Sequence, residues 1–229
     1  MNAWRDDSGF DGPSGADGGG PRRYASPLIA ERRARILDEA KTLIGEVGAA
    51  AFTLRDLGRR ANVSVTTIYN IFGDKEGVIA HALREFHAGI KLALPSAAAN
   101  LPGYLRALAD TTAIVIEHRA YSLALADLYF SVSLAPALFD MIRTMPLQVF
   151  SHWLWAARRD DLLGGHCDAA VAESSFANLE WATIKDWGAG RIVDAELAGA
   201  RQRSFLLMVA AVGGGEVREQ AAGVLRVRG

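Results

Sequence analysis

The chain has 229 residues, of which 50% are hydrophobic and 22% charged, so it can bury one large core or two smaller ones. Its 25 Lys and Arg against 26 Asp and Glu exclude a whole-chain charge excess, so a nucleic acid would have to be met by a local patch. The single cysteine, Cys167, excludes an intrachain disulfide and a Cys-based structural zinc site. With an acidic N-terminus and no long apolar stretch, these features favour a cytoplasmic protein without a membrane span.

The first segment, residues 1–27, is rich in glycine and proline. Such a composition cannot offset its ordering entropy by burial, so we expect a disordered tail. Arg22 and Arg23 at its end could reach a phosphate as a basic arm, although a solvated linker is the simpler interpretation.

From Leu28 onward the pattern is helical. Apolar residues recur on one helix face from Ile36 to Val47, and Gly48 follows as a C-cap. Thr53 is an N-cap with an acid three positions later, which predicts a short helix over 54–61. Ser64 predicts the start of another helix over 65–72, and Asp74 caps a fourth helix that ends near Pro95.

The remainder of the chain keeps the helical spacing and shows no alternating strand pattern. It predicts helices over 102–117, 120–132, 136–157 with a break at Pro146, 167–187 and 194–212, followed by a frayed tail after three glycines at 213–215. The expected fold is therefore all-α. Its parts are the tail 1–27, a group of short helices with a connecting helix over 28–93, and a second all-helical domain over 94–229.

Two short capped helices around the tight turn at Asn62-Val63 form a helix-turn-helix pattern, whose second helix lies in the major groove. The hydroxyl groups of Thr66 and Thr67 can form hydrogen bonds with base edges or phosphates. Residues 28–93 carry a net charge of +2, against −2 for residues 94–229. The predicted DNA contacts are Thr53, Arg55, Ser64, Val65, Thr66, Thr67, Tyr69, Asn70 and Lys75.

A longer run around this motif carries a family pattern. It consists of Arg35-Ile36-Leu37 with Ala40, Gly48, Phe52 to Leu57, Ala61 to Ser64, and Thr67 to Glu76, with Tyr69, Phe72 and Lys75 in a Tyr-x-x-Phe-x-x-Lys register. Over residues 30–85 the chain resembles the TetR family of bacterial transcriptional repressors. Asn62 departs from the usual glycine but tolerates a left-handed backbone, and Thr67 departs from a small residue, which could change the bases read.

The resemblance implies a homodimer that binds a palindromic double-stranded operator and is released by a small-molecule effector. It also implies that residues 28–93 form a helix-turn-helix DNA-binding domain with a connecting helix and that residues 94–229 form a helical ligand-binding and dimerisation domain. Helices 169–187 and 194–212 would then form the dimer interface. The predicted interface residues are Ala170, Ser174, Ala177, Asn178 and Trp181 on the first helix and Leu197, Ala200, Ser204, Leu207 and Met208 on the second.

Aromatic residues crowd the middle of the second domain; most should be core, but some could line an apolar pocket for a hydrophobic or aromatic ligand. The predicted pocket residues are His118, Tyr121, Tyr129, Phe130, Phe150 and Trp153. No catalytic or cofactor-binding motif is present, and we expect no enzyme, cofactor or metal. Two alternatives stay open. One is a helical small-molecule-binding or scaffolding protein that does not read DNA. The other, more remote, is a helical enzyme that uses a metal held by His81 and Glu85, or by His166 in the run His166-Cys167-Asp168.

Overall fold

A computed structural model describes residues 27–93, 100–132, 134–165 and 168–228. The expected tail 1–27 lies outside these residues except for Pro27, as do His166 and Cys167 of the alternative metal site. The described residues form an all-α fold without strands, and none of their helices is long and apolar enough to cross a membrane. The helices are α1 (Pro27–Ala51), α2 (Leu54–Arg60), α3 (Val65–Phe72), α4 (Lys75–Ala93), α5 (Leu101–Glu117), α6 (Arg119–Tyr129), α7 (Pro136–Thr144), α8 (Leu147–Arg159), α9 (Ala169–Gly188), α10 (Asp194–Val212) and α11 (Gly215–Arg228).

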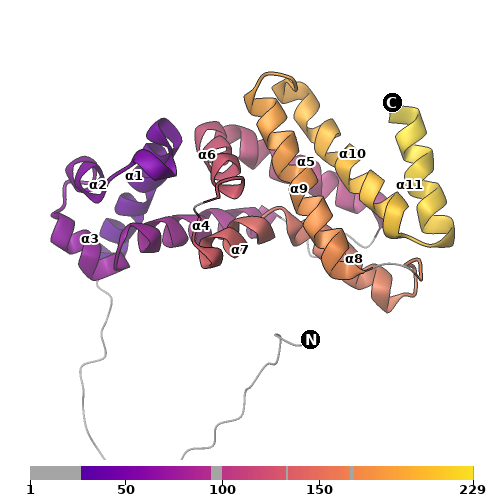
Figure 1. Cartoon of the computed structure of the whole chain (residues 1–229), viewed down its shortest axis with the longest axis horizontal. Coiled ribbons are helices and arrows are strands. Elements are labelled where there is room, and N and C mark those ends of the chain that lie inside the picture. The colour runs from indigo at the N-terminus through magenta and orange to yellow at the C-terminus, as the bar shows by residue number, and fades with distance from the viewer. Residues whose placement is uncertain (1–26, 94–99, 133, 166–167, 229) are drawn as a thin grey trace, which may run out of the picture.

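The molecule is elongated, with α1–α3 at one end and α11 at the other (Figure 1). Helix α4 runs from the α3 end toward the centre, where it meets α5 and α7. Two hydrophobic clusters follow from this layout. One joins α1–α4 to α6, α7 and part of α9, and the other joins α5, α8, α9, α10 and α11. The first cluster runs without a break from the α3 end to the middle of the molecule.

The caps predicted around the helix-turn-helix are present. The Thr53 hydroxyl accepts a hydrogen bond from the Asp56 amide at 3.1 Å, and the Ser64 hydroxyl accepts one from the Thr67 amide at 3.1 Å. Asn62 has a φ of 52°, the left-handed conformation expected where a glycine is usual. The turn therefore forms despite the substitution.

The contact between α1 and α6 depends on a glycine. A Cβ atom at Gly45 would lie 2.9 Å from the Ala120 Cβ and 3.1 Å from backbone atoms at the start of α6. These distances are too short for a side chain to fit without displacing a helix. Helix α1 is thus packed closely against α6 at this point.

The C-terminal residues differ from the expectation of a frayed tail. They form α11, which packs against α10 and buries Ala221, with Val217, Val224 and Leu225 beside it. Gly215 adopts a φ of 45°, which lets the chain turn and begin a new helix after α10. The spacing of these four residues is helical, so the three preceding glycines reverse the chain rather than end the folded structure.

Candidate functional site

Helix α3 presents a polar face to solvent. Ile68 and Phe72 are buried in the first cluster, whereas Thr66, Tyr69 and Asn70 are exposed, with 53% of Tyr69 accessible. This alternation follows from the helical period, because residues 68 and 72 are one turn apart on the inner face. Among the residues predicted to contact DNA, these three form one accessible surface.

The other predicted polar contacts take part in the caps. Thr53 donates its hydroxyl hydrogen to Asp56 at 2.7 Å, and the hydroxyls of Ser64 and Thr67 lie 2.8 Å apart. Val65 is half-buried beside the first cluster. These residues hold the ends of α2 and α3, so their hydroxyl groups are less available to DNA than that of Thr66.

The basic residues near α3 are mostly engaged within the protein. Arg60 bridges α2 to α1 through Glu39 at 3.1 Å and through Glu46, and this hydrogen bond raises the pKa of Arg60 and lowers that of Glu46. Arg59 pairs with Asp56 at 2.9 Å. Arg55 is exposed and has no ion-pair partner among the described residues, which leaves it available for a phosphate.

Lys75 also has an internal partner. Its Nζ donates a hydrogen bond to the Ala50 carbonyl oxygen at 2.7 Å and lies 4.9 Å from the centre of the Phe52 ring. A cation at this place satisfies a carbonyl at the C-terminal end of α1. The predicted phosphate contact by Lys75 therefore requires its ammonium group to serve two partners or to change partner.

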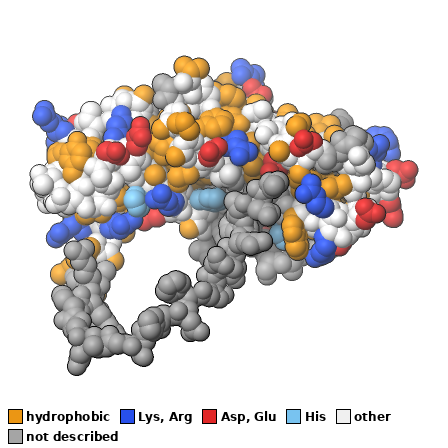
Figure 2. Space-filling view, turned by 60° about the horizontal axis from the view of Figure 1, so that its bottom comes forward, with side chains coloured by type: hydrophobic (Ala, Val, Ile, Leu, Met, Phe, Trp, Pro, Cys, Tyr) orange, Lys and Arg blue, Asp and Glu red, His pale blue; other side chains and the backbone are white. Residues whose placement is uncertain are grey.

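Lys and Arg side chains are visible at the α3 end in the space-filling view, and acidic and basic side chains are mixed at the opposite end (Figure 2). The charge excess of +2 counted for residues 28–93 is modest, and Glu39, Glu46 and Asp56 pair with Arg60 and Arg59. The α3 surface differs from the rest of the surface by its place in the helix-turn-helix and by its exposed hydroxyl and amide groups more than by its charge.

Helices α9 and α10 pack side by side as a hairpin (Figure 1). Of the residues predicted for a dimer interface, six are buried within this chain, so their side chains cannot supply an open face without rearrangement. They are Ala177, Trp181, Leu197, Ala200, Ser204 and Met208. Four of them, Ala177, Trp181, Leu197 and Met208, belong to the two hydrophobic clusters that join α9 and α10 to the rest of the fold.

Three large apolar side chains of the same hairpin are accessible. Val171 is 61% exposed and Leu207 is 53% exposed, and Leu179 is also exposed. The remaining four predicted residues, Ala170, Ser174, Asn178 and Leu207, are on exposed positions, although the Asn178 side chain accepts a hydrogen bond from the Tyr129 hydroxyl at 2.7 Å. Of the ten residues predicted for the dimer interface, four are thus on exposed positions and six are buried within this chain.

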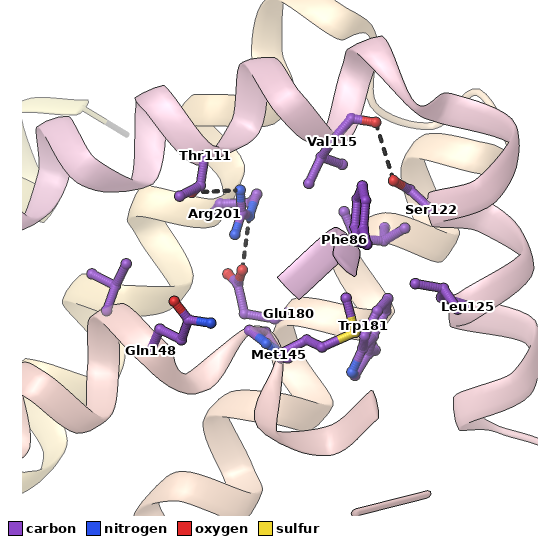
Figure 3. Close-up of a pocket in the computed structure, with 13 residues that line it drawn as sticks. Phe86, Thr111, Val115, Ser122, Leu125, Met145, Gln148, Glu180, Trp181 and Arg201 are labelled. Carbon is purple, nitrogen blue, oxygen red and sulfur yellow. Dashed lines mark hydrogen bonds and ion pairs between the residues drawn. The ribbon is translucent and has the colours of Figure 1, made fainter. Parts of the chain in front are cut away.

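A cavity of about 50 Å³ lies at the centre of the molecule, between α4, α5, α6, α8, α9 and α10 (Figure 3). Most of its lining is apolar, but a buried ion pair lies in its wall, with the Arg201 Nε 2.7 Å from the Glu180 Oε2. Arg201 also donates to the hydroxyls of Thr112 at 2.8 Å and Thr111 at 3.3 Å. Burial raises the pKa of Glu180, and the adjacent Arg201 acts in the opposite direction.

None of the six residues predicted for a ligand pocket lines this cavity. Phe150 is packed in the second cluster and Tyr121 and Tyr129 in the first, while His118 and Phe130 are exposed. Trp153 borders a different, more open cavity of about 630 Å³ between α5, α8 and the start of α11. The aromatic residues are mostly core, and the cavity is lined instead by residues that the sequence reading did not select, among them Gln148, Glu180 and Arg201.

The structure also bears on the alternative metal site. His81 donates a hydrogen bond from its Nδ1 to the Gly77 carbonyl oxygen at 2.8 Å and contacts the Phe72 ring edge to face, while Glu85 pairs with Lys41. The described residues hold no group of three or more His, Cys, Asp or Glu side chains that could bind a metal ion.

The profile of the family described as bacterial regulatory proteins, tetR family, matches residues 36–82, which include α2 and α3. A curated relative, the HTH-type transcriptional regulator BetI of Burkholderia thailandensis, is 36% identical over 61 residues, covering 25% of this chain and 31% of BetI. The matched region is thus about a third of the length of that relative.

Similar folds extend over most of the chain. A transcription regulator from Shewanella sp. PV-4 assigned to the tetR family matches with a TM-score of 0.62 and 15% identity, covering 80% of this chain and 99% of that one. SmeT, the repressor of the Stenotrophomonas maltophilia multidrug efflux pump SmeDEF, matches with a TM-score of 0.56 and 18% identity, covering 81% and 92%. The match to the tetR family profile is thus confined to residues 36–82, around the helix-turn-helix, and the likeness to the solved structures shows a shared all-α fold over about 80% of the chain.

Proposed function

We propose that this chain is a ligand-responsive transcriptional repressor that binds a palindromic operator as a homodimer. The observation that carries the proposal is the exposed polar face of α3. The opposite face of α3 is buried through Ile68 and Phe72, and the N-caps Thr53 and Ser64 fix the starts of α2 and α3. A helix so presented in a helix-turn-helix can enter the major groove. The SmeT name supports repression as the sign of regulation.

The dimer is supported by the outer face of the α9–α10 hairpin, where Val171, Leu179 and Leu207 are exposed. Apolar side chains of this size, on two adjacent long helices, are suited to burial against a second copy. A two-fold dimer carries two α3 helices, which would read half-sites about one DNA turn or a multiple of it apart. The division into a DNA-binding domain over 28–93 and a ligand-binding and dimerisation domain over 94–229 is part of the same proposal.

Ligand response is supported by the cavity beside α4. Phe86 of α4 lines the cavity, and the other end of α4 follows α3 directly at Gly73-Asp74. Since the cavity is only about 50 Å³, a ligand with a ring must bind a form in which the lining is more open. Such a ligand would shift the population toward that form by its differential affinity for the two forms.

The proposal is tested by operator binding, measured by fluorescence anisotropy on a duplex selected for high affinity. Replacing Thr66→Ala is expected to lower the affinity for the selected duplex by about tenfold and to leave the affinity for a random duplex unchanged, as for loss of a base contact. Thr144→Ala, an exposed threonine of α7, is the matched control and should change neither affinity. Equal binding of all duplexes by the unaltered protein would contradict sequence-specific reading.

A further inference from the structure

We propose that the central cavity binds an uncharged small molecule with a largely apolar body that carries both a hydrogen-bond donor and a hydrogen-bond acceptor. This inference rests on the proposed function, because it names the class of effector to which the repressor responds. It is carried by the charge balance of the cavity wall and by the polar atoms that the fold leaves without partners.

The charged groups of the wall already neutralise each other. Glu180 is 1% exposed and Arg201 is 5% exposed, and they are joined by a direct hydrogen bond. No other charged side chain lines the cavity among the described residues. A ligand ion would therefore enter a buried space without a counter-charge, at a large desolvation cost.

Four polar atoms at the cavity have no hydrogen-bond partner within the part of the chain that the structure describes. They are the Glu180 Oε1, the Trp181 Nε1 and both amide atoms of Gln148. The Gln148 amide points toward the Glu180 carboxylate, which is held on its other side by Arg201 (Figure 3). Buried polar groups without partners are costly, and a ligand that pairs with them recovers this cost.

The chemistry of these atoms defines the ligand. The Glu180 Oε1 requires a donor, and the Trp181 indole N–H requires an acceptor. The Gln148 amide can meet either kind of group. An amide or an alcohol on an apolar body supplies both functions without a net charge, whereas a hydrocarbon supplies neither.

The rest of the lining sets the shape of the ligand body. Phe86, Val115, Leu125 and Ile184 are buried apolar side chains on four different helices, which favours a compact apolar group. Met145 is the adaptable part of the wall, because an unbranched thioether side chain can change rotamer to admit a ring.

The test uses four probes with the same ring and similar shape: benzamide, toluene, benzylammonium and benzoate. Binding to the full chain is measured without DNA by isothermal calorimetry and by the Trp181 indole N–H resonance, assigned with Trp181→Phe. Benzamide is expected to bind about tenfold more tightly than each of the other three, the value of one or two buried hydrogen bonds. It is also expected to move the Trp181 resonance in the direction of a stronger hydrogen bond.

Variants of the wall sharpen the test. Glu180→Gln leaves Arg201 without its partner and should shift the preference from benzamide toward benzoate, and Arg201→Gln should shift it toward benzylammonium. Gln148 lies at a partly exposed site, and Gln148→Leu keeps the ion pair. This variant should weaken the binding of benzamide and leave the binding of toluene unchanged. Thr144→Ala is the control and should leave all four affinities unchanged. If the two charge variants fail to fold, the four-probe series and Gln148→Leu still decide the matter.

Tighter binding of either ion, equal binding of toluene and benzamide, or no binding of any probe up to its solubility limit would overturn the proposal. Because these assays contain no DNA, their outcome is independent of operator binding. A protein that binds benzamide but no DNA would refute the repressor function and keep the ligand class. A protein that binds a selected operator but none of the probes would refute the ligand class alone.

Discussion

The buried ion pair between Glu180 and Arg201 leads to a quantitative prediction. Removing one partner, by Glu180→Leu or Arg201→Met, leaves the other charge buried and uncompensated, so each single variant should lower the free energy of unfolding by about 3–5 kcal/mol. In the double variant no charge remains in the wall. Thr111 and Thr112 still donate to the Leu108 carbonyl at 3.1 and 2.6 Å, so the loss of Arg201 does not strand their hydroxyl hydrogens.

The double variant should therefore cost much less than the sum of the single variants, with a coupling energy of about 3 kcal/mol or more. Urea unfolding followed by circular dichroism measures it, at a fixed protein concentration because dimerisation affects apparent stability. The exposed pair Arg191 and Asp186, 2.8 Å apart, is the control, and its coupling should be below about 1 kcal/mol. Additive effects of the Glu180 and Arg201 replacements would refute the reasoning.

Three other perturbations give further predictions. Gly45→Ala should destabilise the protein by about 1–3 kcal/mol in urea unfolding, because its Cβ would overlap Ala120. Gly89 has open space around it, so the control Gly89→Ala should be neutral or stabilising. Equal effects of the two replacements would contradict the close contact between α1 and α6. Tyr121→Phe should leave stability unchanged or raised at neutral pH, since the buried hydroxyl has no partner among the described residues. Burial also raises the pKa of Tyr121 above its ordinary value of 10.0, so the free energy of unfolding falls as the pH rises above that value toward the folded-state pKa. The Tyr121→Phe variant lacks this ionisable group and should therefore lose less stability than the unaltered protein in alkaline unfolding experiments. An identical loss would argue against this burial. Lys75→Met should lower the melting temperature, because the hydrogen bond to the Ala50 carbonyl is lost. If Lys75 also contacts a phosphate, the variant should reduce the dependence of operator affinity on salt concentration by about one unit of slope. An unchanged slope would restrict Lys75 to its structural role.

The helix-turn-helix formed by α2 and α3 could be predicted closely because its signals are local. The caps at Thr53 and Ser64 and the left-handed tolerance of Asn62 determine the ends of α2 and α3 within a few residues. The roles of Arg60 and Lys75 could not be predicted, since their partners Glu46 and Ala50 lie on another helix. Side-chain pairing across helices depends on tertiary packing, which helical periodicity does not report.

In the C-terminal half of the chain, the residues that line the central cavity could not be predicted as closely. The aromatic residues were conspicuous in the sequence, but Phe150 and Tyr129 fill the clusters, as large aromatic side chains usually do. The cavity was missed although a signal existed. Glu180 and Arg201 are opposite charges placed within the inward apolar stripes of α9 and α10, where a lone charge would be too costly to bury. Such a pair of exceptions indicates a buried polar site.

Selection of bound duplexes from a random DNA pool, at a stated moderate salt concentration, tests the central claim most directly. We expect enrichment of a palindrome whose half-site centres are separated by about one helical turn or a multiple of it, bound by a protein that is dimeric in light scattering. Enrichment of no sequence by the folded dimer, with or without benzamide, would contradict sequence-specific operator reading and favour a binding protein that does not read DNA.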